Sequence, residues 1–263
     1  EIGEGLRLIG ELAEYAKNQK REECDVSELV VGLKCGGSDG FSGLTANPLI
    51  GRFSDKLISK GGSTVLTEVP EMFGAETILM NRCVNEEVFD KTVSLINDFK
   101  DYFTSHNQVV YENPSPGNKK GGITTLEDKS LGCVQKSGSA DVEDVIEIGG
   151  SVTRKGLNLL TGPGNDIVAV TNLTASGCHL ILFSTGRGTP VGAPVPTVKI
   201  ATNTNLAKRK PHWIDFNAGE IINGADLTDE LFEYVIEVAN GKQTNNEKNG
   251  YKEISIFKDG VVL

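Results

Sequence analysis

Residues 35–43 combine a thiol, a carboxylate, hydroxyls and several glycines directly after the apolar run 29–33. Open α/β sheets bind ligands at the carboxyl ends of their strands, so this segment is a candidate site. Cys35, Ser38 and Asp39 would supply a soft thiolate, a hydroxyl and a hard carboxylate, a mixture that suits iron or another divalent transition metal better than magnesium. A buried cysteine at the base of a turn is the alternative, and both interpretations stay open.

Two carboxylates, Glu68 and Glu71, lie on either side of Val69 and Pro70 at the end of the next strand-like run, 63–69. We expect them on the same rim as Cys35, the edge of the sheet at the carboxyl ends of its strands, where they could bind a metal or exchange protons. The alternative is a helix start, where the helix dipole favours acidic residues. This alternative weighs more for Glu71 than for Glu68.

The Gly/Pro-rich segment 113–122 contains Asn118 and Lys119. Their amide and ammonium could meet a substrate carboxylate, and a partly desolvated Lys119 could act as a base. A solvated loop lysine is the alternative, which composition alone favours.

A second candidate for anion binding follows the apolar run 179–183. There Thr185, Gly186, Arg187 and Thr189 would offer backbone N–H groups, hydroxyls and a guanidinium fork that matches a carboxylate or a phosphate. The segment lacks the Gly-Lys-Ser/Thr ending of a Walker loop, and residues 36–37 do not form a dinucleotide fingerprint. Nucleotide binding is therefore disfavoured.

The other thiols and histidines favour a structural interpretation. Cys133, Cys178 and His179 remain possible metal ligands, but they lie on apolar periodic segments, which favours positions in the core. The three histidines show no metal-type spacing and no Ser/His/Asp arrangement, which leaves a triad hydrolase without support.

Helix-like and strand-like segments alternate along the chain, which predicts an α/β fold with a parallel sheet, helices on both faces and right-handed crossovers. An amphipathic helix that packs on one side is expected from residue 2 to about residue 20. Strands are expected at 28–33, 63–69, 179–183, 197–201 and 213–216, with a short edge strand at 253–257. Further helices are expected at 46–59, 75–80, 86–102, 124–136, 168–176 and 227–239.

Length and charge narrow the class of protein. A chain of 263 residues can bury a real core without disulfides, and we interpret residues 1–263 as a single domain. The net charge of −10 argues against nucleic-acid binding. Five cysteines without a short-spaced pair predict a reduced, cytoplasmic protein, and no apolar run approaches the roughly 20 residues of a membrane span. The lack of an initiator Met suggests that an upstream region is missing.

Several separate motifs resemble the altronate and galactarate dehydratase family, specifically its catalytic carboxyl-terminal part. They lie at residues 35–48, 113–119, 185–190 and 213–219, and the resemblance covers nearly the whole chain. It implies the carboxyl-terminal part of a longer enzyme, with a Rossmann-like three-layer fold, a mainly parallel sheet and an unusual crossover. The large subunit of sulfolactate sulfo-lyase is similar to the same family, so these motifs leave the leaving group open.

The resemblance implies an iron-dependent lyase that dehydrates a sugar acid to a 2-keto-3-deoxy acid, with Mn²⁺ or another divalent cation as the alternative to Fe²⁺. The implied metal ligands are Cys35, Glu68 and Glu71. The implied catalytic residues are Lys119, Glu68 and Arg187. The implied substrate-binding residues are Ser38, Asp39, Asn118, Thr185, Gly186, Arg187 and Thr189, with Asp215 as a second-tier candidate.

In the expected mechanism, Lys119 or a rim carboxylate removes the C2 proton, and positive charge from Arg187 and a metal near Cys35 stabilises the enediolate as the C3 hydroxyl leaves. The expected partner is a small sugar acid, and a homodimer stays open. The alternatives are elimination from sulfolactate and a module that binds a sugar acid or another anion without turnover.

Overall fold

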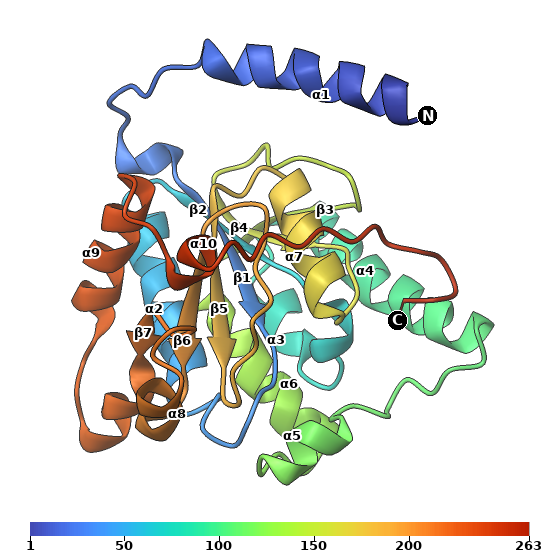
Figure 1. The fold of residues 1–263 in the computed structure, drawn as a ribbon. Helices are drawn as coiled ribbons and strands as arrows, with labels where there is room; N and C mark the ends of the chain where they lie inside the picture. The colour runs from blue at the N-terminus through green and yellow to red at the C-terminus, as the bar shows by residue number, and fades with distance from the viewer. Residues whose placement is uncertain (263) are drawn as a thin grey trace.

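A seven-stranded sheet forms the centre of the protein, whose computed structural model describes residues 1–262 (Figure 1). The strand order is β3-β4-β2-β1-β5-β6-β7, and each neighbouring pair is parallel. The strands are β1 (Val30–Cys35), β2 (Ser63–Leu66), β3 (Val142–Ile146), β4 (Gly156–Leu160), β5 (Leu180–Thr185), β6 (Thr197–Ala201) and β7 (Phe216–Asn217). The predicted α/β fold with a parallel sheet is confirmed.

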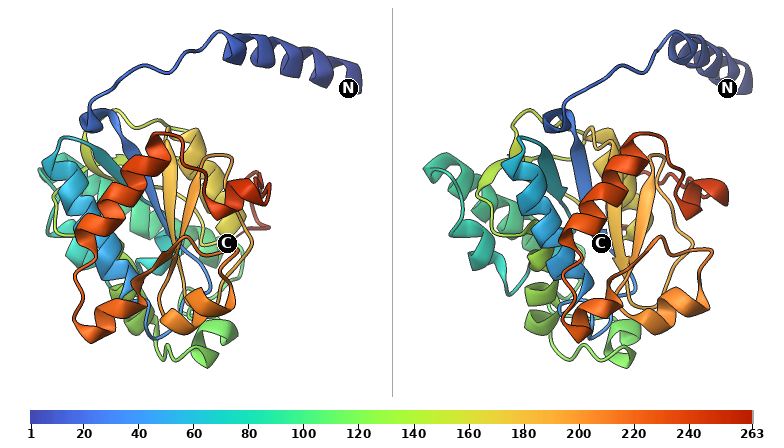
Figure 2. Two further views of the ribbon diagram at one scale, coloured as in Figure 1. Left: turned by 60° about the vertical axis from the view of Figure 1, so that its left-hand side comes forward. Right: turned by 90° about the vertical axis from the view of Figure 1, so that its left-hand side faces the viewer.

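Helices cover both faces of the sheet (Figures 1 and 2). One face carries α2 (Ala46–Ser59), α4 (Glu86–Ser105) and α9 (Thr228–Ala239), and the other carries α7 (Asp166–Ala175) and α10 (Asn245–Lys248). The remaining helices are α1 (Ile2–Lys17), α3 (Glu76–Met80), α5 (Pro116–Lys120), α6 (Leu126–Val134) and α8 (Thr204–Arg209), with 3₁₀ turns η1 (Val26–Glu28), η2 (Val69–Glu71), η3 (Gln135–Ser137) and η4 (Ala218–Asn223).

Side chains alternate between the two faces, as a strand requires. On β1, Val31 and Leu33 belong to the apolar cluster that includes Phe53 of α2. On β5, Ile181 and Phe183 belong to the opposite cluster. The face that a strand residue occupies therefore decides which set of helices it meets.

The strand order reverses beside β1, because the chain continues from β1 to β2 on one side and later returns to β5 on the other. Ligands of open α/β sheets bind outside the carboxyl ends of the strands at such a switch point. Within residues 1–262, no α-helix connects β3 to β4 or β5 to β6. Because β1 and β5 are parallel neighbours, the loops that follow them, 36–45 and 186–196, lie at the same edge of the sheet.

The amino-terminal helix differs from its prediction. It ends at Lys17, none of its residues is buried, and it stands apart from the body of the protein (Figure 2). The expected packing of one face was wrong for the described part of the chain, since Leu6, Ile9 and Leu12 are each more than half exposed. No helix within residues 1–262 combines the length and the apolar character needed to cross a membrane.

Some strand predictions were also wrong. Residues 253–257 form no strand, because the backbone of Ser255 donates to the Thr171 side chain instead of pairing with a neighbouring strand. The strand expected at 213–216 is the two-residue β7. The acidic β3 and the short β4 were missed, since neither has the long apolar run of a central strand.

Candidate active site

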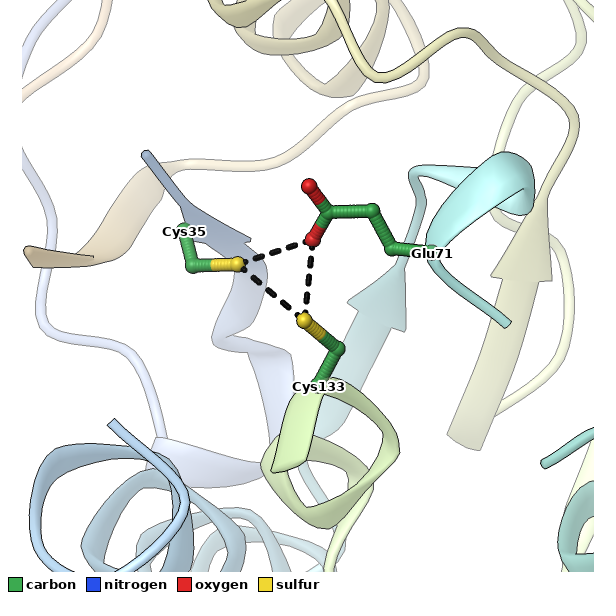
Figure 3. Close-up of side chains that lie close together, drawn as sticks. All are labelled: Cys35, Glu71 and Cys133. Carbon is green, nitrogen blue, oxygen red and sulfur yellow. Dashed lines mark hydrogen bonds between the residues drawn. The ribbon is translucent and has the colours of Figure 1, made fainter. Parts of the chain in front are cut away.

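A buried cluster of two thiols and one carboxylate lies at the carboxyl end of β1 (Figure 3). Cys35 comes from the end of β1, Glu71 from η2 and Cys133 from α6. The Sγ atoms of Cys35 and Cys133 are each 3.0 Å from Glu71 Oε2 and lie 3.6 Å from each other. The relative exposures are 1%, 8% and 4%, so the cluster is shielded from solvent.

Local structure explains why these side chains converge. Alternation on β1 turns Cys35 to the same face as Leu33, toward α2. Pro70 is the second residue of the η2 turn that carries Glu71, and Thr125 caps the amino terminus of α6 with its hydroxyl. The site is therefore assembled from three separate elements: the end of β1, the η2 turn and α6.

Lysines surround the cluster. Lys136 Nζ donates to Cys35 Sγ at 2.9 Å, and Lys129 Nζ forms an ion pair with Glu71 Oε1 at 2.8 Å. Burial alone would raise the pKa of Glu71, but Lys129, Lys136 and Lys34 outweigh it and hold that pKa well below its usual range. Glu71 is therefore a carboxylate at neutral pH.

Glu68 occupies a different place from the one expected for a metal ligand. Its carboxylate accepts hydrogen bonds from Cys35 N at 3.0 Å and Lys136 Nζ at 2.9 Å, and it pairs with Lys34. The structure therefore puts Glu68 among ammonium groups, outside the group of ligand atoms formed by Cys35, Glu71 and Cys133.

The three ligand atoms of the cluster fit a divalent transition metal. They all lie within 4.8 Å of one another. A tetrahedral ion with metal–sulfur bonds of about 2.3 Å separates two sulfurs by roughly 3.8 Å. The observed Sγ–Sγ distance of 3.6 Å is close to that value. Two sulfurs and one carboxylate oxygen also match the softness of Fe²⁺ or Zn²⁺ better than that of Mg²⁺.

Asp39, predicted to bind substrate, has its carboxylate occupied within the protein. It accepts from Ser42 Oγ at 3.1 Å, from Thr202 Oγ1 at 2.9 and 3.1 Å, and from Asn203 Nδ2 at 3.1 Å. A Cβ on Gly186 would collide with this carboxylate, so only glycine fits there. Asp39 thus ties the loop after β1 to the loops after β5 and β6.

Asn118 connects α5 to the loop after β1. Its Nδ2 donates to the backbone oxygen of Ser38 at 3.0 Å, and its Oδ1 accepts from Ser115 Oγ at 2.8 Å in a capping box. Lys119, on the same short helix, is exposed. The structure does not bring Lys119 to the buried cluster.

The segment predicted to bind an anion, residues 185–189, forms a loop at the same carboxyl edge of the sheet. Arg187 is exposed and its Nη1 donates to the Gly117 oxygen at 2.8 Å, while Thr185 Oγ1 accepts from Gly188 N at 2.9 Å. Thr189 Oγ1 accepts from Val191 N at 3.3 Å. These contacts bring the loop after β5 next to α5 at the carboxyl edge of the sheet. A common substrate cleft between the segments around residues 35, 68, 118 and 187 stays a prediction.

Asp215, the second-tier substrate candidate, and His179, for which the core was favoured, are not part of the cluster. Asp215 accepts backbone hydrogen bonds from Lys199 and Asn245, both at 2.8 Å, and burial raises its pKa. His179 is exposed at the amino end of β5, so its assignment to the core was wrong, whereas Cys178 is buried as expected.

Sequence reasoning missed three members of the site and undervalued a fourth. The core was favoured for Cys133 over a ligand role; Cys133 is buried, and its sulfur belongs to the cluster. Lys34, Lys129 and Lys136 are buried beside it. Lys34 had a signal, because a lysine inside the apolar run that leads to Cys35 must be buried on one face of the sheet.

A pocket of about 250 Å³ opens at the carboxyl edge, and two of its lining residues, Thr202 and Asn203, donate to Asp39. Its walls carry amides, hydroxyls and one aromatic ring, from Phe41, Thr202, Asn203, Thr204, Asn205, Gly219, Ile222 and Asn223. A larger pocket of about 580 Å³ lies at the amino edge of the sheet, between the segment 21–26 and the end of α9.

Comparison with known proteins gives close relatives. The chain is 62% identical over 267 residues to the altronate dehydratase of Bacillus subtilis and 59% identical over 266 residues to that of Escherichia coli; both matches cover 100% of the chain. It is 40% identical to the galactarate dehydratase (L-threo-forming) of Escherichia coli, a match that covers 98% of the chain and 50% of that relative.

The chain spans 54% of the length of each of the two altronate dehydratases. It also matches the (2R)-sulfolactate sulfo-lyase subunit beta of Chromohalobacter salexigens, at 34% identity over 98% of the chain and 68% of that subunit. Residues 26–262 match the family described as D-galactarate/Altronate dehydratase, C-terminal. The chain therefore belongs to the D-galactarate/altronate dehydratase family.

Proposed function

We propose that this chain carries the active site of a hydro-lyase that removes water from a sugar acid such as altronate or galactarate and yields a 2-keto-3-deoxy acid. The observation that supports this proposal best is the buried Cys35–Glu71–Cys133 cluster among lysines, at the switch point of the sheet. The names of the relatives support the substrate class, because they are altronate and galactarate dehydratases.

The reaction requires positive charge beside the substrate carboxylate. A proton on the carbon next to a carboxylate is weakly acidic, and its removal puts a second negative charge on that group. Lys34 and Lys136 are buried at this edge. Burial would lower the pKa of each amine, but Glu68 raises that of Lys34, and Cys35 together with Glu68 raises that of Lys136, above the ordinary lysine value. Their fixed charges would stabilise the enediolate without reorganisation of solvent.

We propose Cys35, Glu71 and Cys133 as the residues that hold a divalent metal, with Fe²⁺ preferred and Mn²⁺ as the alternative. When bound, the ion would supply a Lewis acid for substrate oxygens. Glu68 would then act as a positioning residue, because it holds Lys34 and Lys136 in place. Arg187, on the loop after β5, is the proposed partner of the substrate carboxylate.

Metal binding can be tested apart from turnover. Co²⁺ bound to thiolates gives sulfur-to-metal charge-transfer absorption in the near ultraviolet, so anaerobic titration with Co²⁺ should produce this band. Cys133→Ser should abolish it, whereas Cys24→Ser, which changes an exposed free thiol, should leave it intact. An unchanged band in Cys133→Ser would remove Cys133 from the ligand set.

Activity should be assayed anaerobically with Fe²⁺ on the protein that contains residues 1–263, using altronate, galactarate and sulfolactate in parallel. Formation of a 2-keto acid from either sugar acid supports the dehydratase. Release of sulfite from sulfolactate would favour the alternative elimination, which the match to the sulfo-lyase subunit supports. Binding of a sugar acid without product would favour a binding module.

A further inference from the structure

The pocket of about 250 Å³ at the carboxyl edge is lined entirely by uncharged residues. They come from the loop after β1, the segment 202–205 that leads from β6 into α8, and η4. Drug-sized ligands occupy about 300–1,000 Å³, so this pocket suits a smaller group of a few carbon atoms. Its walls favour a group that is itself neutral, because an ion would find no opposite charge on them.

One part of the wall donates its hydrogens to a buried carboxylate. Thr202 Oγ1 donates to Asp39 at 2.9 Å, and Asn203 Nδ2 donates to Asp39 at 3.1 Å. Asp39 is 8% exposed, so its charge lies directly behind these two lining residues and is weakly screened by water. A negatively charged ligand group would be repelled from this part of the pocket.

Another part of the wall does the same toward Glu220. Thr204 Oγ1 donates to this carboxylate at 2.8 Å, and Asn223 Nδ2 donates to it at 3.2 Å. These two hydrogen bonds hold the pKa of Glu220 below its usual range, so the group is ionised at neutral pH. The pocket is therefore flanked by two carboxylates that contact its lining residues.

The direction of these hydrogen bonds determines what the pocket can bind. A hydroxyl that has given its only hydrogen to a carboxylate can offer a further partner nothing but lone pairs. The ligand must then donate, as an alcohol O–H does and a carboxylate cannot. Phe41 and Ile222, which are 45% and 55% exposed, add apolar surface for C–H groups. A carbon chain that bears hydroxyls meets both requirements.

The pocket adjoins the proposed active site through two loops. Phe41 lies on the loop after β1, whose last residue is Cys35. Asn203 Nδ2 also donates to the backbone oxygen of Gly186 at 3.2 Å, and Gly186 directly precedes Arg187. The wall of the pocket thus contacts the loop that carries the proposed partner of the substrate carboxylate.

We propose that this pocket is the subsite for the hydroxyl-bearing end of the sugar acid, with Thr202, Thr204 and Asn223 as acceptors of its O–H groups. This inference rests on the proposed dehydratase function and narrows its substrate to acids with a single carboxylate. Altronate ends in a neutral CH₂OH group, whereas galactarate ends in a second carboxylate, which Asp39 and Glu220 repel. The chain should therefore act on altronate in preference to galactarate.

The first test fills the pocket. Asn205 is an exposed residue of α8 that lines it, and Asn97, an exposed residue of α4, provides the matched control. We expect Asn205→Phe to weaken altronate binding in calorimetry by about tenfold or more, and Asn97→Phe to change it by less than about twofold. An affinity of Asn205→Phe within about threefold of wild type would overturn the subsite and leave the dehydratase intact.

The second test changes charge rather than shape. Glu220→Gln should raise the efficiency on galactarate relative to altronate by about threefold or more, whereas Glu233→Gln, at an exposed position of α9, should leave that ratio unchanged. Wild type that uses galactarate as efficiently as altronate would overturn the proposed selectivity. If wild type forms no keto acid from either acid, the dehydratase proposal fails, and binding alone decides on the subsite.

That binding can be observed in wild type, independently of any variant's folding. In protein labelled with [¹⁵N]asparagine and kept free of Fe²⁺, the side-chain amide signals of Asn203, Asn205 and Asn223 should shift on addition of altronate. The neutral polyol threitol should shift the same signals, and the dicarboxylate succinate should not. Signals that altronate leaves in place, or that succinate shifts as strongly as threitol, would overturn the proposal.

Discussion

Lys34 and Lys199 occupy the same row of the sheet, on the two strands that flank β5. Both have 0% exposure, and both lie against the Phe183 ring. Lys34 contacts Glu68 and has Asp166 Oδ1 at 3.0 Å, whereas Lys199 has no partner within residues 1–262. The pKa of Lys34 lies above its usual value, because the carboxylates outweigh burial, and that of Lys199 falls to about 7.

The comparison shows that burial does not by itself decide whether a lysine is charged. Burial disfavours the ammonium at both positions, and the carboxylates beside Lys34 reverse the outcome. A fixed cation such as Lys34 would stabilise the enediolate of the proposed elimination. The predictions that follow test this difference between the two lysines, beginning with the largest effect.

Lys34→Met should destabilise the fold by about 3–5 kcal/mol, because it removes one partner of a buried ion pair and leaves Glu68 with Lys136 alone. The shift of the urea midpoint at constant m-value measures this loss. Lys155→Met, which breaks an exposed pair with Glu28, is the control and should cost less than about 1 kcal/mol. A loss below 1 kcal/mol for Lys34→Met would contradict the contrast with Lys199.

Lys199→Met should have the opposite sign and stabilise the fold by about 1–3 kcal/mol at pH 7, since a thioether of similar length replaces an unsatisfied polar group. The same urea series gives the value. If this variant were destabilised by more than 1 kcal/mol, the amine would have a partner in solution and the comparison would fail.

Stability should depend on pH through Lys199. Its native pKa of about 7 lies below the ordinary 10.5, so between these values the unfolded chain binds a proton that the native state does not. Stability therefore rises with pH in this window, by up to about 1.4 kcal/mol per pH unit. The difference in unfolding free energy between wild type and Lys199→Met isolates this contribution and should favour wild type increasingly from pH 7 to pH 9. A difference that stays constant would contradict a neutral Lys199.

Lys119→Met should change stability by less than about 0.5 kcal/mol, because the side chain is exposed. Thermal unfolding at matched pH is sufficient to detect a larger effect. A loss above 1 kcal/mol would show that Lys119 is buried in solution, as a partly desolvated base would be.

The alternation of segments was enough to predict the parallel sheet and the common rim, because both follow from local periodicity and general rules of connection. It pointed to Cys35, the last residue of β1, and to Glu71, in the η2 turn after β2. It could not place Cys133, because an apolar helical segment such as 126–134 has the same pattern whether its cysteine meets the core or a second thiol. Lys199 was missed because the absence of a carboxylate beside it depends on strand order, which the sequence does not state.

The backbone at Glu68 has φ 72°, a left-handed conformation that costs a residue with a Cβ about 1 kcal/mol or more. Glycine would suit this backbone but would bring no carboxylate, and asparagine, which tolerates the same angles, would bring no charge. Substitutions at this position should therefore be judged on two separate scales, conformational and electrostatic. Glycine or asparagine here would relieve the backbone strain, and that gain in stability would mask the loss from leaving Lys34 and Lys136 without the Glu68 carboxylate.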